Sequence, residues 1–182
     1  MPISINHITG EEVSIPKALD DSDNIFNFLK KNEGKKVVVV QGLGFVGAVM
    51  SLVCANAITE DYAVIGVDLP NEKNFWKIKS INDGVFPLIA DDPKIDHFFN
   101  NAKEKGNFLA TYDSLAYEYA DVIIVDINLD VQKEISKKRS LDSFDVNLKG
   151  FESAIETIAS HCKDDILTVS YTHLTLPTKR IV

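Results

Sequence analysis

A buried strand that runs straight into a glycine-rich turn constrains this chain more than any other feature. Residues 37–40 are four consecutive valines, bounded by lysine on one side and by glutamine and glycine on the other. A continuous β-branched run of this kind is typical of a strand buried on both faces of a parallel sheet. The next residues read Gly42-Leu43-Gly44-Phe45-Val46-Gly47, and a segment of small and apolar residues, 45–58, predicts a helix. This order predicts the first half of a dinucleotide-binding βαβ unit.

Each glycine of the predicted turn has its own physical role. Gly42 permits the tight turn out of the strand, Gly44 lets the backbone approach a pyrophosphate closely, and Gly47 lets the helix pack against the strand. The start of the helix presents unpaired N–H groups and a partial positive charge to the phosphates. We therefore predict that this turn receives the pyrophosphate of a dinucleotide.

An acidic residue stands where this interpretation needs one. A second apolar strand, predicted over residues 62–67, ends at Asp68, 21 residues after Gly47. A carboxylate at this place accepts hydrogen bonds from the adenosine ribose and repels a 2′-phosphate, so NAD is favoured over NADP. The alternative is a glycine-rich turn that holds no ligand. We favour a bound ligand, because the strand, the turn, the helix, the second strand and the acidic residue follow one another at the expected spacing.

The rest of the chain alternates strands and helices. Helices are expected at residues 23–31, 72–82, 93–105 and 144–162, and strands at 108–110, 121–126 and from 166 onward. This alternation predicts an α/β protein, a Rossmann-like doubly wound parallel sheet in a single domain. We place a short N-terminal appendage at residues 1–34 and the NAD-binding domain at 35–168. The basic and polar stretch 132–140 is expected to be an exposed loop.

Composition and charge narrow the class of protein. The chain has 182 residues and a net charge of −8, which argues against nucleic acid as a partner. No apolar run reaches the roughly 18 residues of a membrane-spanning helix, and residues 1–20 lack the pattern of a secretory signal. Cys54 and Cys162 have no metal-ligand spacing, and the histidines are scattered. We predict a cytoplasmic protein with no metal site and no membrane partner.

Five segments in a fixed order resemble the N-terminal domain of the UDP-glucose/GDP-mannose dehydrogenase family. The glycine turn and the strand ending at Asp68 are shared with many dehydrogenases. The later segments are more specific to the family: Ile81-Asn82-Asp83-Gly84 with Pro87, Ala110-Thr111-Tyr112-Asp113, and Ala120-Asp121-Val122-Ile123-Ile124. The resemblance covers residues 36–168.

The resemblance implies an activity and further site residues. Enzymes of this family oxidise C6 of a nucleotide sugar from alcohol to uronate and consume two NAD. It implies contacts with the pyrophosphate along the whole turn, at Leu43, Phe45 and Val46 as well as at Gly42, Gly44 and Gly47. It also implies a contact from Asp68 with the adenosine ribose and one from Lys73 nearby, and it places Thr111 near the cofactor. It also implies a nucleotide-sugar substrate for the full-length protein, which is expected to be a homo-oligomer.

Two departures from the family pattern keep other functions open. The family usually has "V-P-T-P" or "V-G-T-P" where this chain reads Ile127-Asn128-Leu129-Asp130, and its "E-P-G" becomes Asp92-Pro93-Lys94. A non-catalytic NAD-sensing module is therefore one alternative. Another Rossmann-type dehydrogenase, such as a hydroxyacid enzyme, is a second.

No catalytic residue is assigned within these 182 residues. Cys54 lies among apolar residues of the predicted first helix and is interpreted as a structural thiol. Cys162 follows His161, but neighbours on a helix point about 100° apart, which argues against a Cys–His pair. In the family, the nucleophilic cysteine and the catalytic lysine lie downstream of the segment that these 182 residues match. This chain alone is therefore expected to be inactive. Residues 169–182 resemble a translated sequencing adapter and are expected to be a non-native tail.

Overall fold

A five-stranded parallel sheet forms the centre of the molecule. The computed structural model describes residues 2–127, 131–135 and 141–170. The sheet order is β5-β4-β3-β6-β9, with β3 at Lys36–Gln41, β4 at Tyr62–Val67, β5 at Phe108–Thr111, β6 at Val122–Val125 and β9 at Leu167–Ser170. Every neighbouring pair is parallel, and β3 lies in the middle. The strand order reverses beside β3, as expected for a doubly wound sheet, and ligands bind at such a point.

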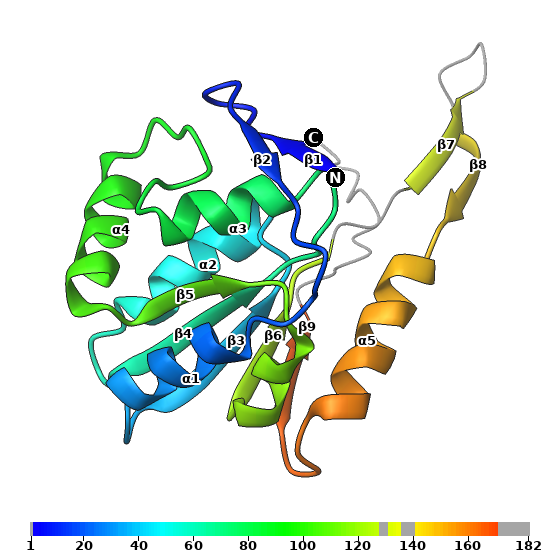
Figure 1. The fold of residues 1–182 in the computed structure, drawn as a ribbon. Helices are drawn as coiled ribbons and strands as arrows, with labels where there is room; N and C mark the ends of the chain where they lie inside the picture. The colour runs from blue at the N-terminus through cyan, green and yellow to red at the C-terminus, as the bar shows by residue number, and fades with distance from the viewer. Residues whose placement is uncertain (1, 128–130, 136–140, 171–182) are drawn as a thin grey trace, which may run out of the picture.

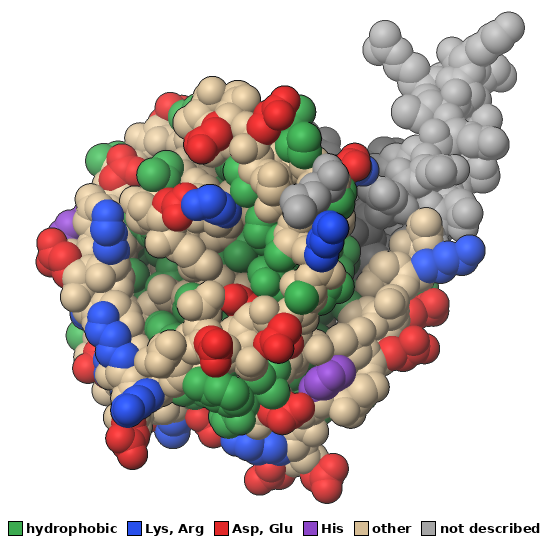
Figure 2. Space-filling model, in the orientation of Figure 1, with side chains coloured by type: hydrophobic (Ala, Val, Ile, Leu, Met, Phe, Trp, Pro, Cys, Tyr) green, Lys and Arg blue, Asp and Glu red, His purple; other side chains and the backbone are tan. Residues whose placement is uncertain are grey.

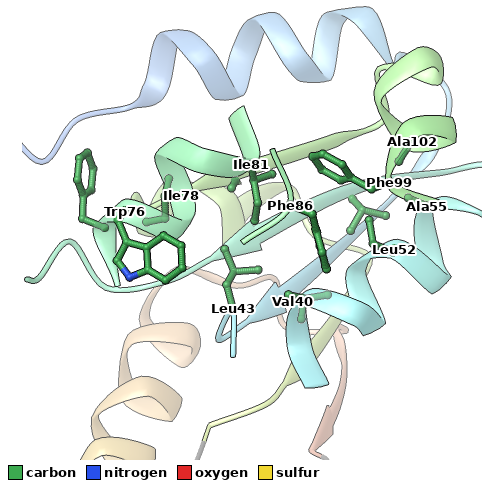
Figure 3. Close-up of a cluster of buried hydrophobic side chains, with 14 of the residues drawn as sticks. Val40, Leu43, Leu52, Ala55, Trp76, Ile78, Ile81, Phe86, Phe99 and Ala102 are labelled. Carbon is green, nitrogen blue, oxygen red and sulfur yellow. The ribbon is translucent and has the colours of Figure 1, made fainter. Parts of the chain in front are cut away.

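Helices cover both faces of this sheet (Figure 1). On one face lie α2 (Phe45–Ala55), α3 (Phe75–Asn82) and α4 (Pro93–Lys105). Their apolar side chains form the larger core with Val38 and Val40 of β3, and Figure 3 shows Leu52, Ile81 and Phe99 within it. The other face is covered by α1 (Ser22–Lys31), the 3₁₀ helix η1 (Ser114–Tyr119) and α5 (Lys149–His161). The predicted α/β fold is thus confirmed.

The N-terminal residues pack closely on the sheet and on α3. Ile25 and Phe28 of α1 are buried in the second core with Val39 and Ile65. Before α1, the antiparallel strands β1 (Ile3–Ile5) and β2 (Glu12–Ser14) form a hairpin that the sequence interpretation missed. The Ser4 hydroxyl donates a hydrogen bond to the carbonyl of Glu72 and accepts one from the N–H of Trp76. The hairpin is thereby joined to the start of α3.

Two expectations about the region after β6 were wrong. Residues 144–146 do not belong to a long helix, because β8 (Leu141–Val146) pairs in antiparallel fashion with β7 (Val131–Ile135), and α5 begins only at Lys149. The Asn147 side chain accepts a hydrogen bond from the N–H of Lys149 where the helix begins. The pairing of β7 with β8 also means that residues 132–135 form part of a strand, not the expected loop. The other residues of that expected loop, 136–140, lie outside the described part.

The last described residues belong to the sheet. Val169 and Ser170 are opposite Ile124 and Val125 of β6, although we expected the non-native tail to begin at residue 169. The remainder of that expected tail, residues 171–182, lies outside the described residues, so its origin stays a prediction. Of the helices that the structure describes, none has the length and apolar character needed to cross a membrane.

Candidate functional site

The glycine turn joins β3 to α2 at the carboxyl edge of the sheet. Gly42 has φ +98°, a left-handed conformation that favours glycine, and a Cβ placed there would lie 2.0 Å from the carbonyl oxygen of Asp126. A Cβ on Gly47 would lie 1.9 Å from the carbonyl oxygen of Gly42. A Cβ on Gly44, by contrast, has no protein atom within 4 Å. Two glycines therefore close the turn, and the third leaves open space in front of it.

The backbone of the turn is prepared to receive an anion. The first helical hydrogen bond of α2 runs from the N–H of Ala48 to the carbonyl of Gly44, so the N–H groups of Phe45 and Val46 precede it. Both side chains are exposed, which leaves the helix start accessible, while the Leu43 side chain is fully buried. Among the predicted turn residues, Leu43 therefore packs its side chain into the core, and only its backbone belongs to the surface of the turn.

Asp68 lies directly beside this turn. Its carboxylate is buried, with Oδ2 accepting the N–H of Leu43 at 3.1 Å and Oδ1 accepting the N–H of Leu69 at 2.8 Å. Burial raises the pKa of Asp68, and the charge of Lys77 and the two backbone N–H groups lower it. The turn and the acid were predicted separately from the sequence, and the structure joins them by a hydrogen bond.

The lysine that approaches Asp68 is Lys77, which the sequence interpretation missed. Its Nζ lies 3.7 Å from Asp68 Oδ2 and donates a hydrogen bond to Asn74 Oδ1 at 3.0 Å. Lys73, the predicted residue, has an exposed side chain. The two lysines are four residues apart, about one helical turn. Since α3 begins at Phe75, Lys73 precedes the helix and Lys77 lies in its first turn. A cofactor contact from Lys73 stays a prediction.

Thr111 is next to Asp68, but its hydroxyl already has a partner. The Thr111 carbonyl accepts the N–H of Asp68, and its fully buried hydroxyl donates to Asp21 Oδ2 at 2.6 Å. The N–H of Asp21 donates in turn to Asp113 Oδ2. These two hydrogen bonds attach the segment that precedes α1 to the carboxyl end of β5, where Thr111 lies. A cofactor contact from Thr111 also stays a prediction.

A buried tyrosine holds the residue before the turn. The Tyr117 hydroxyl of η1 donates to Oε1 of Gln41, the last residue of β3. Burial, followed by the charge of Asp68, raises the pKa of Tyr117 far above its ordinary value. The phenol therefore stays neutral and retains the proton that it donates. This contact fixes the end of β3 from the face opposite α2.

Cys54 and His161 make contacts away from the glycine turn. Cys54 is half-buried in α2, and burial raises the pKa of its thiol, which opposes formation of the reactive thiolate. His161 Nδ1 lies 2.8 Å from the Thr157 carbonyl, and Nε2 lies 3.1 Å from Ser114 Oγ. Because a carbonyl only accepts, Nδ1 donates the hydrogen bond to Thr157. This arrangement connects α5 to η1.

The residues at this edge fit a dinucleotide. Open space before Gly44, N–H groups at the start of α2 and a carboxylate beside the turn are the features that a pyrophosphate and its adjoining ribose require. Figure 2 shows acidic and basic side chains mixed on the face that carries α1 and β5, with hydrophobic side chains gathered near its middle. Among the described residues, no three histidine, cysteine, aspartate or glutamate side chains are grouped to hold a metal ion.

Comparison with known proteins identifies the family and supports the fold. Residues 35–180 match the family model described as the NAD binding domain of the UDP-glucose/GDP-mannose dehydrogenase family. A solved NDP-N-acetyl-D-galactosaminuronic acid dehydrogenase from Methanosarcina mazei is similar over 80% of this chain, with 21% identity and a TM-score of 0.61. No curated protein sequence matches the chain.

Two further solved structures share the fold. A UDP-D-ManNAc dehydrogenase from Pyrococcus horikoshii is similar over 74% of this chain, with 25% identity and a TM-score of 0.56. A GDP-mannose dehydrogenase from Pseudomonas aeruginosa is similar over 73%, with 23% identity and a TM-score of 0.53. The chain spans 29%, 28% and 28% of the three solved chains, respectively.

Proposed function

Since the chain belongs to the UDP-glucose/GDP-mannose dehydrogenase family, we propose that it holds NAD for a nucleotide-sugar 6-dehydrogenase that oxidises a UDP- or GDP-sugar to its uronate. The observation that carries the proposal is the hydrogen bond between the Leu43 N–H in the glycine turn and the Asp68 carboxylate. It brings the pyrophosphate and ribose ends of one cofactor site together. Bound NAD accepts a hydride. Oxidation of an alcohol to a carboxylate requires two hydride transfers and therefore two molecules of NAD.

The protein's own residues bind and orient the cofactor in this proposal. The N–H groups of Phe45 and Val46 face the pyrophosphate, and Asp68 accepts from the ribose hydroxyls. Lys77 keeps positive charge beside the buried Asp68 carboxylate, favouring its ionised form. The full-length protein is proposed to be a cytoplasmic homo-oligomer that takes a nucleotide sugar as substrate.

We expect NAD to bind at least about tenfold more tightly than NADP, because the buried Asp68 carboxylate would face the added 2′-phosphate and like charges at close range repel. Calorimetric titration of the protein with each dinucleotide measures the ratio. An Asp68→Asn variant keeps an oxygen acceptor and removes the charge, so its preference for NAD should shrink. Equal binding of the two cofactors by the unmodified protein would remove Asp68 from this role.

We also expect the 182-residue chain to produce no NADH with a nucleotide sugar, since neither described cysteine is suited to act as the nucleophile beside the glycine turn. Burial raises the pKa of Cys54, and Cys162 follows the end of α5 on the face away from the glycine turn. Absorbance of NADH with UDP-glucose, UDP-N-acetylglucosamine, UDP-N-acetylmannosamine and GDP-mannose tests this. Turnover that persists in a Cys54→Ser, Cys162→Ser double variant would place another catalytic group in the chain. Turnover that this double variant abolishes would assign the chemistry to one of the two thiols.

An NAD-sensing module without chemistry is the second candidate. The departure that favours it is the stretch Ile127-Asn128-Leu129-Asp130, where the family usually carries a threonine. Ile127 is half-buried, and residues 128–130 lie outside the described part. NAD binding with no turnover by the full-length protein would favour the sensing module over the dehydrogenase.

A further inference from the structure

A carboxylate lies beneath the start of α2, where the proposed site receives the negative charge of the cofactor. Asp126 follows β6, the strand next to β3 on the side away from β4. Its side chain is half-buried, and a Cβ placed on Gly47 would lie 3.1 Å from Asp126 Oδ2. Gly47 is the third residue of α2, so this carboxylate lies against the first turn of the helix.

Backbone contacts on two sides fix the position of Asp126. Its N–H donates to the carbonyl of Gln41 at 2.8 Å, and its carbonyl oxygen packs against Gly42 so closely that a Cβ there would lie 2.0 Å away. The backbone of Asp126 is therefore fixed against the start of the glycine turn, while its side chain lies against Gly47 at the other end. Burial raises the pKa of Asp126, and a hydrogen bond from the Gly47 N–H lowers it.

Asp126 differs from Asp68 in having no cationic partner within the described part of the chain. Lys77 balances Asp68, whereas none of the ion pairs among the described residues includes Asp126. The partial positive charge at a helix start attracts any anion nearby, a side-chain carboxylate as well as a phosphate. Asp126 and a bound pyrophosphate would therefore share the same helix start and repel each other.

We infer that Asp126 sets the affinity of this site by repelling the pyrophosphate of the dinucleotide, so that NAD binds less tightly and leaves more readily than the glycine turn alone would allow. The inference rests on the proposed function. It suits a reaction that uses two NAD for each sugar, because the first reduced cofactor must leave before the second NAD enters. Asp126 is thus proposed as a residue that tunes cofactor exchange.

The test is the dissociation constant of NAD for an Asp126→Asn variant. Asparagine has nearly the same shape, keeps an oxygen for the Gly47 N–H and removes the charge. We expect NAD to bind at least about fivefold more tightly, because the substitution removes a negative charge from the helix start that the pyrophosphate would share. ADP-ribose, which carries the same pyrophosphate, should gain equally, and adenosine, which has none, should not gain.

Asp121→Asn is the matched control. Asp121 precedes the same strand at its opposite end, and its carboxylate accepts the N–H of Val37, a bond that asparagine also allows. The net charge changes by the same amount, roughly 16 Å away along the strand, so NAD affinity should change by less than about twofold. Asp126→Ser is a second uncharged variant, and thermal unfolding without NAD checks that both Asp126 variants are folded.

The outcomes separate this inference from the proposed function. NAD binding by the unmodified protein with equal or weaker binding by the folded Asp126 variants would overturn the role of Asp126 alone. An equal gain in the Asp121 variant would attribute the effect to net charge and would also overturn it. If neither the unmodified protein nor any variant bound NAD, the proposed function itself would be wrong.

Discussion

Replacing Gly47 with alanine is expected to destabilise the fold by at least about 3 kcal/mol, because the new methyl group has no room. A Cβ at this position would lie 1.9 Å from the Gly42 carbonyl oxygen, which is backbone and does not move aside as a flexible side chain would. Helix propensity alone predicts the opposite sign, since alanine in a helix is favoured over glycine by about 1 kcal/mol. The close approach of α2 to the turn therefore decides the result.

Urea unfolding of the variant measures this loss, with Gly150→Ala as its control. Gly150 lies near the start of α5, and a Cβ there meets no atom within 4 Å, so the control should lose no stability. A Gly47→Ala protein as stable as the unmodified one would show that α2 does not pack on the turn as the structure has it.

Replacing Gly44 with valine is expected to leave the fold largely intact and to weaken NAD binding by at least about tenfold. Gly44 has φ −70° and ψ −168°, a backbone conformation open to any residue, and a Cβ there meets no protein atom within 4 Å. The valine side chain would instead fill the space that the pyrophosphate needs. Loss of a favourable residue before the helix start should cost stability only modestly.

Calorimetry with NAD tests this prediction beside Gly150→Val, which makes the same chemical change at another open glycine. The control should bind NAD as the unmodified protein does. A folded Gly44→Val protein with unchanged affinity would place the cofactor away from the turn. Together the Gly44 and Gly47 variants separate the glycine that serves the ligand from one that serves the fold.

The central strands and the helix at Pro93–Lys105 could be predicted because their signals are local. Consecutive β-branched residues predict β3 and β6 wherever they lie in the fold. The start of α4 is also written locally, with Asp92 accepting the N–H of Lys94 just before Pro93. The glycine turn and Asp68 were predictable because their spacing follows from the geometry of a βαβ unit.

Features set by contacts between distant segments could not be predicted in this way. The apolar spacing of residues 144–146 fits a helix as well as a strand, and only the pairing of β8 with β7 decides between them. Lys77 was missed because the start of α3 is fixed by a hydrogen bond from the Trp76 N–H to the Ser4 hydroxyl, 72 residues away. Asp126 was missed because its importance comes from Gly47, on another element.

The most direct test of the proposed cofactor site is NMR of the isotopically labelled protein during titration with NAD. The amide signals of residues 42–47 and of Asp68 should move together and saturate with one dissociation constant, because pyrophosphate and ribose belong to one ligand. The amides of β7 and β8 should stay unchanged. Saturable NAD binding that leaves the signals of the turn in place, or no binding at all, would contradict the assignment of this site.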